Sequence, residues 1–409
     1  MLLANFLNKI FKIGGFVLED ANGRKHTIGK ADSTEKPLTV KLLKKKLHIQ
    51  LLIWPQWYFP LAYEEGIIQI YNGSITEVVD TFYRNTGKKG TTGGISKYID
   101  KLFSFWLRVA KITAIKTAKQ QIQKHYDVDR HREGNELYKL FLDKNLIYSC
   151  GVWLPGDDLE RAQERKIKLI LDKLHIQPND KIVDIGSGWG YATLTAAKLT
   201  KAECLGITLS QNQLDYSRKK AKELNLHNQV RFELMDWRKL DIKADAAFSV
   251  GAIEHFQRRN YFKFFQKLYS ILKDKTGRAL IHSIFSSIPY KRRIRSRYLQ
   301  KKIFPGGEIS DLEGFTKPIA EANFELIDAH IIRGENGYVK TLNAWLQNLR
   351  KNKHEIVKKF GANLYRRYEI YLTGSMSSFQ PYSDQNVVQL LIAKQKDSRV
   401  WRITIQPVS

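Results

Sequence analysis

At the centre of the chain stand Lys181-Ile182-Val183-Asp184-Ile185, followed directly by Gly186-Ser187-Gly188-Trp189-Gly190. The apolar run predicts a buried strand over residues 181–185, and the glycines predict a tight turn that opens a helix over residues 191–199. Glycine lets the backbone approach a ligand without a Cβ clash, and the first turn of a helix supplies free N–H groups. This segment therefore predicts a strand–turn–helix unit that holds a ligand.

The glycine spacing and the end of the next strand bear on which ligand binds. G-x-G-x-G is shorter than the G-x-G-x-x-G of dinucleotide folds, and an NAD site also expects an acidic residue about 20 residues further on. The second strand, predicted over residues 202–209, ends without an acid, which leaves Thr208 and Gln213 as partners for a ribose. With Asp184 two residues ahead of the turn, the pattern favours S-adenosylmethionine (SAM). A purely structural turn and an NAD or FAD site stay open at this point.

Asp236 and Trp237 follow the third predicted strand, at residues 230–234. A carboxylate there can accept a hydrogen bond from an adenine amine, and an indole can cover the adenine ring. The alternative interpretation of the pair is a cap beside a packed aromatic ring.

The region from about residue 160 onward alternates strands with helices. Further strands are predicted at residues 246–250 and 278–284, with helices at 161–174 and 211–224. Such alternation predicts a parallel sheet covered on both faces, which is a doubly wound α/β fold. Residues 285–409 mix basic helices with aromatic clusters and end in strand-like runs at 387–393 and 400–405.

The N-terminal part has a different texture and predicts a smaller α+β domain. Short β-like runs at 16–19, 46–53 and 66–71 alternate with turns, and a helix is expected over 74–87. Residues 3–11 form an amphipathic pattern, which fits either a helix packed on its own domain or a contact with a membrane surface. We expect a docking domain over residues 1–94, a linker helix over 95–124 and a catalytic domain over 125–409.

Composition narrows the class of protein. The 409 residues include 68 Lys and Arg against 41 Asp and Glu, a net charge of +27, which predicts attraction to nucleic acid or an anionic membrane. The apolar fraction of 43% is that of an ordinary globular chain, so collagen-like and wholly disordered proteins are excluded. Two cysteines make no disulfide framework and indicate a reducing compartment. The most apolar run, at residues 47–63, is interrupted by His, Gln and Pro and is too polar to span a bilayer.

Several motifs between about residues 120 and 345 occur together in the order of one family. They are His125-Tyr126-Asp127-Val128, Tyr148-Ser149-Cys150-Gly151-Val152-Trp153, the glycine turn, Gly206-Ile207-Thr208-Leu209-Ser210, Ser249-Val250-Gly251-Ala252-Ile253-Glu254-His255, Leu280-Ile281-His282-Ser283-Ile284, Ile303-Phe304-Pro305-Gly306-Gly307, and Tyr338 with Thr341-Leu342 and Trp345. On these residues the chain resembles the cyclopropane-fatty-acyl-phospholipid synthase and mycolic acid cyclopropane synthase family of SAM-dependent methyltransferases. The resemblance implies a class I SAM-methyltransferase fold, with a Rossmann-like doubly wound sheet.

The resemblance also implies two sets of site residues and no metal. Residues expected to bind SAM are Tyr148, Ser149, Gly186, Gly188, Thr208, Gln213 and Trp237, beside the Asp184 and Asp236 that the pattern indicates. Residues expected to be catalytic, around a bound bicarbonate ion, are Cys150, Glu254, His282, Ile284 and Tyr338. Two departures from the family stand out: Ser187 replaces a usual Cys, and residues 129–133 form an insertion in a loop that normally covers the cofactor.

The expected chemistry explains why these residue types are needed. An isolated cis alkene is a weak nucleophile, so methyl transfer needs positioning, a dry channel and fixed negative charge or π-faces near the cation that forms. Ring closure then needs a base, and a bicarbonate or carbonate held by Glu254, His282 and Tyr338 is expected to supply it. Glu254, His282 and the ion are expected to share protons and titrate as a unit. Taken singly, Cys150 is also explained as a small buried apolar residue, His282 as a core histidine and Glu254 as a cap.

The expected function is that of a cyclopropane-fatty-acyl-phospholipid synthase, with methyl-branched fatty-acyl products as an alternative. Rivals of other classes are a nucleic-acid methyltransferase, whose Asn-Pro-Pro-aromatic motif is missing, and a non-catalytic lipid-binding protein. Basic clusters at residues 41–46, 291–302 and 351–359 predict docking on unsaturated, anionic phospholipid. We therefore expect a cytoplasmic protein peripherally associated with the inner face of the membrane, and the family resemblance suggests a homodimer.

Overall fold

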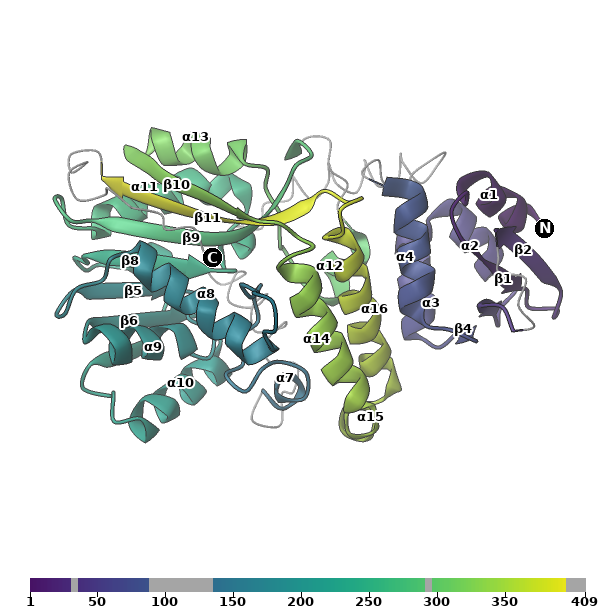
Figure 1. Ribbon diagram of the computed structural model, residues 1–409, viewed down its shortest axis with the longest axis horizontal. Helices are drawn as coiled ribbons and strands as arrows, with labels where there is room; N and C mark the ends of the chain where they lie inside the picture. The colour runs from purple at the N-terminus through teal and green to yellow at the C-terminus, as the bar shows by residue number, and fades with distance from the viewer. Residues whose placement is uncertain (31–35, 88–134, 291–295, 395–409) are drawn as a thin grey trace. The chain divides into compact units, whose positions relative to one another are not determined.

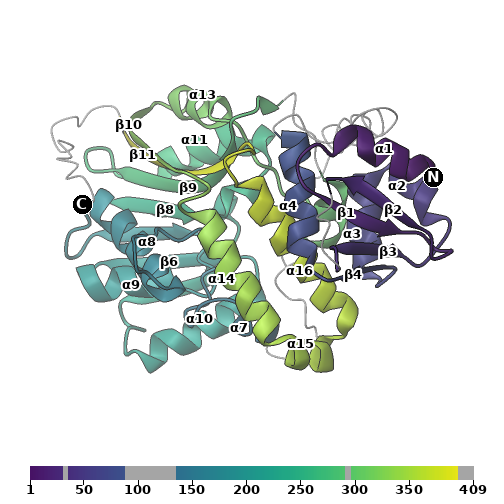
Figure 2. The same cartoon turned by 45° about the vertical axis from the view of Figure 1, so that its right-hand side comes forward.

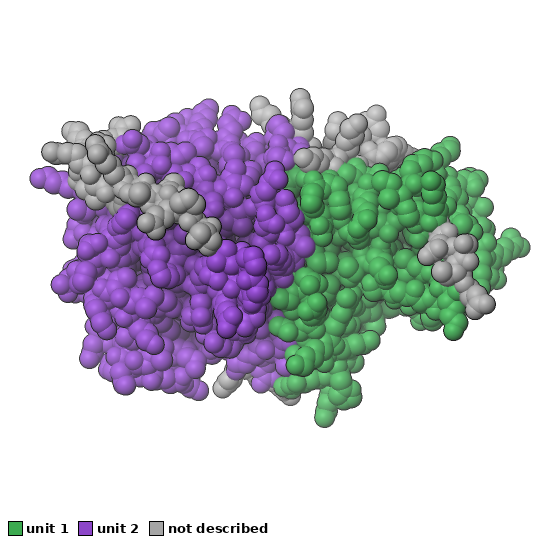
Figure 3. Space-filling view, in the orientation of Figure 1, with its two compact units in different colours: residues 1–111, 291–305, 342–385 green, residues 112–290, 306–341, 386–409 purple. Residues whose placement is uncertain are grey.

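The computed structural model describes residues 1–30, 36–87, 135–290 and 296–394. The chain divides into two compact units (Figure 3): unit 1 comprises residues 1–111, 291–305 and 342–385, and unit 2 comprises residues 112–290, 306–341 and 386–409. The expected linker at residues 88–94 and the expected linker helix over 95–124 lie outside the described residues. The expected catalytic stretch of 125–409 contributes to both units, because 291–305 and 342–385 group with the N-terminal residues.

Unit 2 contains a seven-stranded sheet. Its strands are β5 (Lys181–Ile185), β6 (Glu203–Thr208), β7 (Val230–Leu234), β8 (Ala246–Val250), β9 (Arg278–Ser286), β10 (Phe324–Ile332) and β11 (Gln385–Lys394). They are ordered β10-β11-β9-β8-β5-β6-β7, and β5 to β9 pair in parallel, with Val183 opposite both Leu205 and Ala247. From the neighbouring strands β5 and β8, the sheet extends in both directions: β6 and β7 follow on the side of β5, and β9, β11 and β10 on the side of β8 (Figure 1). This arrangement confirms the predicted doubly wound fold.

Helices cover both faces of this sheet. They are α8 (Leu159–Lys173), α9 (Tyr191–Thr200), α10 (Gln211–Glu223), α11 (Tyr261–Ile271) and α13 (Glu313–Glu321), with short helical turns α7 (Glu136–Lys139), η2 (Trp237–Lys239), η3 (Ile253–His255) and η4 (Arg258–Asn260). Along β5, Ile182 joins one apolar core with α8, α9 and α10, whereas Val183 and Ile185 join another with α11 and α13. Burial on both faces explains why the strand sequences are almost continuously apolar.

The far edge of this sheet differs from the sequence prediction. β10 was not predicted. It pairs antiparallel with β11, and β11 confirms the strand that the sequence predicted at residues 387–393. Only two of the nine β10 residues, Phe324 and Ile332, are buried, so its apolar signal is weak. The strand expected at residues 400–405 lies outside the described residues.

Unit 1 has its own small sheet and core. Strands β1 (Gly15–Glu19), β2 (Lys25–Gly29), β3 (Thr39–Leu42) and β4 (Ile68–Tyr71) are ordered β2-β1-β3-β4. Its helices are α1 (Leu2–Ile10), α2 (Leu47–Ile53), α3 (Pro55–Glu64), α4 (Ile75–Thr86), α12 (Arg297–Lys302), α15 (Lys353–Phe360), α16 (Ala362–Ser378) and the part of α14 (Tyr338–Lys351) from Leu342 onward. Figure 2 shows the sheet together with α1 and α2. The N-terminal residues thus combine strands and helices, as predicted, but residues 291–305 and 342–385 group with them and were not part of the domain predicted over 1–94.

Two sequence interpretations are decided within unit 1. The β-like run at residues 46–53 is the helix α2, because Leu47 and Leu51 are buried at the four-residue spacing of one helix face. The first helix packs on its own unit, since Leu3 and Phe11 belong to the core. Among the described helices, none has both the length and the apolar character of a bilayer-spanning segment.

A buried carboxylate joins distant segments of unit 1. Glu64 of α3 accepts hydrogen bonds from the Tyr298 hydroxyl at 2.7 Å, from Lys302 Nζ at 3.1 Å and from the Arg367 guanidinium at 2.7 Å. Burial opposes the ionisation of Glu64, but the hydrogen bonds from Arg367 and Tyr298 outweigh it and lower its pKa. This carboxylate therefore fixes α12 and α16 to the N-terminal residues.

We expect Glu64→Gln to lower the free energy of unfolding by about 3 kcal/mol, because it removes the buried carboxylate that is the counter-charge of two half-buried cations, Lys302 and Arg367. Chemical denaturation measures this loss, and exposed Glu65→Gln is the matched control. The folded-state pKa of Glu64 is lowered, so the difference between wild type and variant is present above about pH 4.3 and shrinks as the pH falls. Equal stability of wild type and Glu64→Gln at neutral pH would contradict this account.

Candidate functional site

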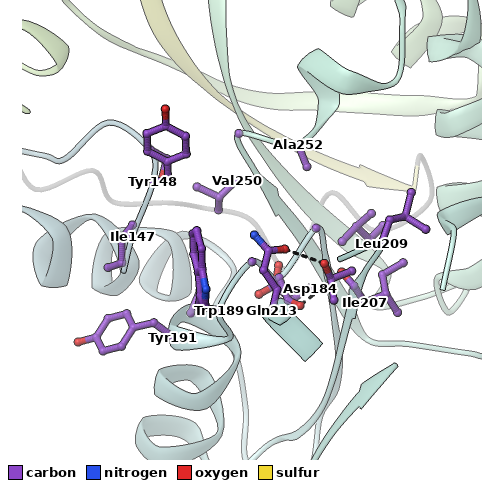
Figure 4. A pocket seen from close by; sticks show the side chains of 18 of the residues that line it. Ile147, Tyr148, Asp184, Trp189, Tyr191, Ile207, Leu209, Gln213, Val250 and Ala252 are labelled. Carbon is purple, nitrogen blue, oxygen red and sulfur yellow. Dashed lines mark hydrogen bonds between the residues drawn. The ribbon is translucent and has the colours of Figure 1, made fainter. Parts of the chain in front are cut away.

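A pocket opens at the carboxyl ends of the central parallel strands of unit 2, where ligands bind in open α/β sheets. Its empty volume is about 970 Å³, counting the space open to solvent. All nine residues expected to bind the cofactor line it: Tyr148, Ser149, Asp184, Gly186, Gly188, Thr208, Gln213, Asp236 and Trp237. In Figure 4, Gln213 and Asp184 lie near the middle, with Tyr148, Trp189 and Tyr191 on one side and Ile207 and Leu209 on the other.

The glycine turn after β5 forms the floor of this pocket. Gly186 and Gly188 have φ angles of +86° and +54°. A Cβ on Gly186 would lie 2.4 Å from the Cβ of Ala252, whereas a Cβ on Gly188 would meet nothing within 4 Å. The N–H groups of Gly186 and Ser187 both donate to the Ile207 carbonyl. The turn is therefore held by backbone contacts, and Gly188 leaves open space in which a ligand can approach the main chain.

Polar groups suited to a nucleoside stand above the turn. The Thr208 hydroxyl donates to Gln213 Oε1 at 2.8 Å, which leaves the Gln213 amide nitrogen to donate to a ligand (Figure 4). Asp184 accepts from the Thr193 hydroxyl at 2.7 Å, and burial raises the pKa of this carboxyl to about 7. Together, the Gln213 amide and the Asp184 carboxyl group fit the ribose and amino-acid parts of SAM.

Asp236 and Trp237, which follow β7, fit both interpretations of the sequence: a cap beside a packed aromatic ring, and a contact with the cofactor. Asp236 caps the turn η2, because its carboxylate accepts from the backbone N–H of Arg238 at 2.9 Å and from the Arg238 guanidinium at 2.9 Å. Trp237 packs against Phe256 and Phe264, and Arg238 lies 4.7 Å from the Trp237 ring centroid. Both residues also line the pocket, so cap and cofactor contact are compatible.

Sequence reasoning missed a buried cation in the pocket wall. Lys166 of α8 donates from Nζ to Ser149 Oγ at 2.6 Å and to Gln163 Oε1 at 2.8 Å, and it is fully buried. Gln163 in turn donates to the Ser149 carbonyl at 2.9 Å. The available signal was two polar residues three apart on the apolar face of the predicted helix over residues 161–174.

The five residues expected to be catalytic lie outside the lining of this pocket. Glu254, in the turn η3, accepts from the Ile284 N–H through Oε1 at 2.8 Å. Its Oε2 is buried and has no hydrogen-bond partner among the described residues, and burial raises the pKa of this carboxyl. The structure thus joins Glu254 to Ile284 directly and leaves one carboxylate oxygen for a ligand. A buried carboxyl oxygen without a partner can, when protonated, donate to an oxyanion such as bicarbonate.

His282 of β9 is buried close to the same centre. Its carbonyl accepts from the Gly251 N–H at 2.9 Å, and Gly251 lines the cofactor pocket. Burial lowers the pKa of the imidazole well below its ordinary value, so the ring is neutral near pH 7. Gln389 of β11 places its Nε2 at 3.4 Å from His282 Nδ1, a neighbour that sequence reasoning missed.

Cys150 lies next to the residue that precedes Tyr338. A Cβ on Gly337 would lie 3.0 Å from Cys150 Sγ, and Gly337 directly precedes Tyr338 at the start of α14. Burial raises the pKa of the Cys150 thiol to about 12, so this group is a neutral thiol rather than a nucleophile. Gly151 and Trp153 both donate to the Thr341 hydroxyl, at 3.0 and 2.9 Å, which fixes the segment after Cys150 to α14.

Comparisons with known proteins agree with this geometry. The family model described as "Mycolic acid cyclopropane synthetase" matches residues 113–390. The methyltransferase UmaA of Mycobacterium tuberculosis is 32% identical over 69% of this chain and 100% of its own length. Cyclopropane mycolic acid synthase 2 of Mycobacterium bovis is 32% identical over 69% of this chain and 97% of its own. The solved structure of mycolic acid cyclopropane synthase CmaA1 with SAH and CTAB aligns with a TM-score of 0.63 at 27% identity, over 70% of this chain and 100% of that one.

We expect Gly186→Ala to weaken S-adenosylhomocysteine (SAH) binding by about tenfold or more, because the added methyl overpacks against Ala252 and displaces the turn. Gly156→Ala is the matched control: Gly156 also has a positive φ, of +82°, but a Cβ there meets nothing within 4 Å. The control should lose about 1 kcal/mol of stability through backbone strain and bind SAH normally. Calorimetric titration measures both, and unchanged affinity in Gly186→Ala would show that the turn does not form the cofactor site.

Proposed function

The chain belongs to the mycolic acid cyclopropane synthetase family of SAM-dependent methyltransferases, and from this we propose that it is a cyclopropane-fatty-acyl-phospholipid synthase. In this proposal it transfers a methylene group from SAM to the cis double bond of an unsaturated phospholipid acyl chain. The carbocation formed on the chain then loses a proton to a bicarbonate-centred base. The alternative within the same chemistry is a methyl-branched fatty-acyl product.

The pocket residues position the cofactor, which when bound supplies an electrophilic methyl group on sulfur. Thr208 and Gln213 offer polar groups to a ribose, Asp236 offers an acceptor to an adenine amine, and Gly188 leaves the space for close approach. Fixing the donor in this way removes most of the entropic cost of bringing two reactants together.

The single observation that carries the proposal is the state of Glu254. Its Oε2 is buried without a described partner, and its Oε1 is held by the Ile284 N–H, so the free oxygen has a fixed direction. The raised pKa of Glu254 and the lowered pKa of His282 favour neutral forms of both groups. A neutral Glu254 donates to an anion, whereas a charged one would repel it. These residues therefore support a bound bicarbonate that takes the proton in ring closure.

A phospholipid substrate is proposed from the charge of the protein. In unit 1, Lys44, Lys45 and Lys46 are exposed at the start of α2, beside Ile49, which is 63% exposed. Exposed lysines next to an apolar side chain favour the surface of an anionic bilayer. In the described part of the basic cluster 291–302, Lys302 binds Glu64 and Arg297 lies 4.8 Å from the Trp54 ring centroid, whereas Lys301 is exposed. We propose peripheral association with the inner face of the membrane, and a homodimer.

The direct test is turnover with SAM on vesicles of mono-unsaturated anionic phospholipid, analysed by mass spectrometry. We expect acyl chains that gain one CH2 unit while their count of rings plus double bonds is unchanged, and slower turnover on neutral vesicles or at high salt because the charge attraction is lost. Activity on RNA without activity on lipid would favour the nucleic-acid methyltransferase. Binding to vesicles without any SAM turnover would favour a non-catalytic lipid-binding protein.

We expect Glu254→Gln to lower kcat by about 100-fold or more, because the amide cannot exchange a proton with the base. Its affinity for SAH should stay within about twofold of wild type, since Glu254 is outside the cofactor pocket. Glu203→Gln, on the exposed start of β6, is the control and should leave both quantities unchanged. Normal turnover by Glu254→Gln would remove this carboxyl group from the mechanism.

A further inference from the structure

Lys166 is an unusual lysine for its surroundings. Its side chain is fully buried in α8, yet it lines the cofactor pocket rather than the apolar core. An ammonium group has three N–H donors, and the two hydrogen bonds to Ser149 Oγ and Gln163 Oε1 account for two of them. Among the described residues, no carboxylate forms an ion pair with this ammonium.

The acid that attracts Lys166, Asp143, forms no ion pair with it among the described residues. Asp143 attracts Lys166 electrostatically, but its own oxygens accept from the backbone N–H groups of Ile147 at 2.8 Å and of Asn145 at 3.0 Å. Burial consequently lowers the pKa of Lys166 to about 7. An unpaired buried cation is costly, and proteins keep one where a ligand supplies the counter-charge.

The polar lining limits which part of the cofactor can meet this cation. The Asp236 carboxylate is on the part of the pocket formed after β7, and it would repel a second carboxylate while accepting from an adenine amine. The amino-acid end of SAM carries the carboxylate of this ligand. Lys166 is a cationic side chain in the lining, so it offers that group the electrostatic partner it needs.

We propose that the Lys166 ammonium, held in place by Ser149 and Gln163, binds the carboxylate at the amino-acid end of SAM. Gln163 positions both partners, because it accepts from Lys166 and donates to the Ser149 carbonyl. The proposal rests on SAM as the methyl donor and is independent of the acyl substrate. It explains why a lysine, rather than an apolar residue, occupies the buried face of α8.

The test compares two ligands that differ only in the amino-acid part, which carries the carboxylate. Calorimetry measures the binding of SAH and of 5′-methylthioadenosine, which lacks the amino-acid part, to wild type and to Lys166→Met. Hydrogen bonds to charged groups are strong, so we expect Lys166→Met to weaken SAH binding about tenfold or more and to change methylthioadenosine binding by less than about twofold. Lys168→Met is the control on the same helix, because Lys168 is exposed and pairs only with Asp172.

One further variant and a stability measurement distinguish loss of the carboxylate contact from loss of the fold. Lys166→Gln retains a donor for Ser149 and should lose the preference for SAH as Lys166→Met does. Thermal unfolding without ligand checks the fold, which should survive because replacing a buried charge by an apolar side chain is often neutral. Equal weakening of both ligands, or unchanged SAH binding, would overturn the proposal. Failure of wild type to bind SAH would instead overturn the cofactor pocket itself.

Discussion

The hydrogen bond from the Gly251 N–H to the His282 carbonyl, 2.9 Å long, joins the two halves of the site. It ties the loop after β8 to β9, and that loop carries Ala252 in the pocket wall and Glu254 in the proposed base site. Ala252 also fills the space that a Cβ on Gly186 would need, so the same loop packs against the glycine turn. One short backbone segment thus connects the cofactor pocket with the proposed base site.

The second feature of this centre is that its ionisable side chains are buried without a partner of opposite charge. Desolvation raises the pKa of Glu254, lowers that of His282 and lowers that of Lys166 to about 7, each toward the neutral form. Such shifts are typical of functional sites, where the missing charge arrives with the ligand. A sulfonium donor with a carboxylate and a bicarbonate ion would bring such charges. In the proposed reaction, the same exclusion of water would protect the carbocation.

Local patterns in the sequence predicted much of this arrangement. The strand–turn–helix at residues 181–199 and the polar residues after β6 and β7 lie together because parallel strands end at one edge of a sheet. The proposed catalytic set was available only through resemblance, since Cys150, His282 and Tyr338 are far apart in the chain. Lys166 and Gln389 were missed because each gains its role from a partner in another element. The division into units was missed for the same reason: Glu64 meets Arg367 across 303 positions.

The central claim is that a base beside Glu254 takes a proton from the transferred methyl group and closes a ring. Turnover with SAM whose methyl group carries three deuterium atoms tests this directly, by mass spectrometry of the product acyl chain. The account predicts that two of the three deuterium atoms remain in the product, because one leaves with the base. Retention of all three would contradict it, since the cation would then have been quenched elsewhere on the chain.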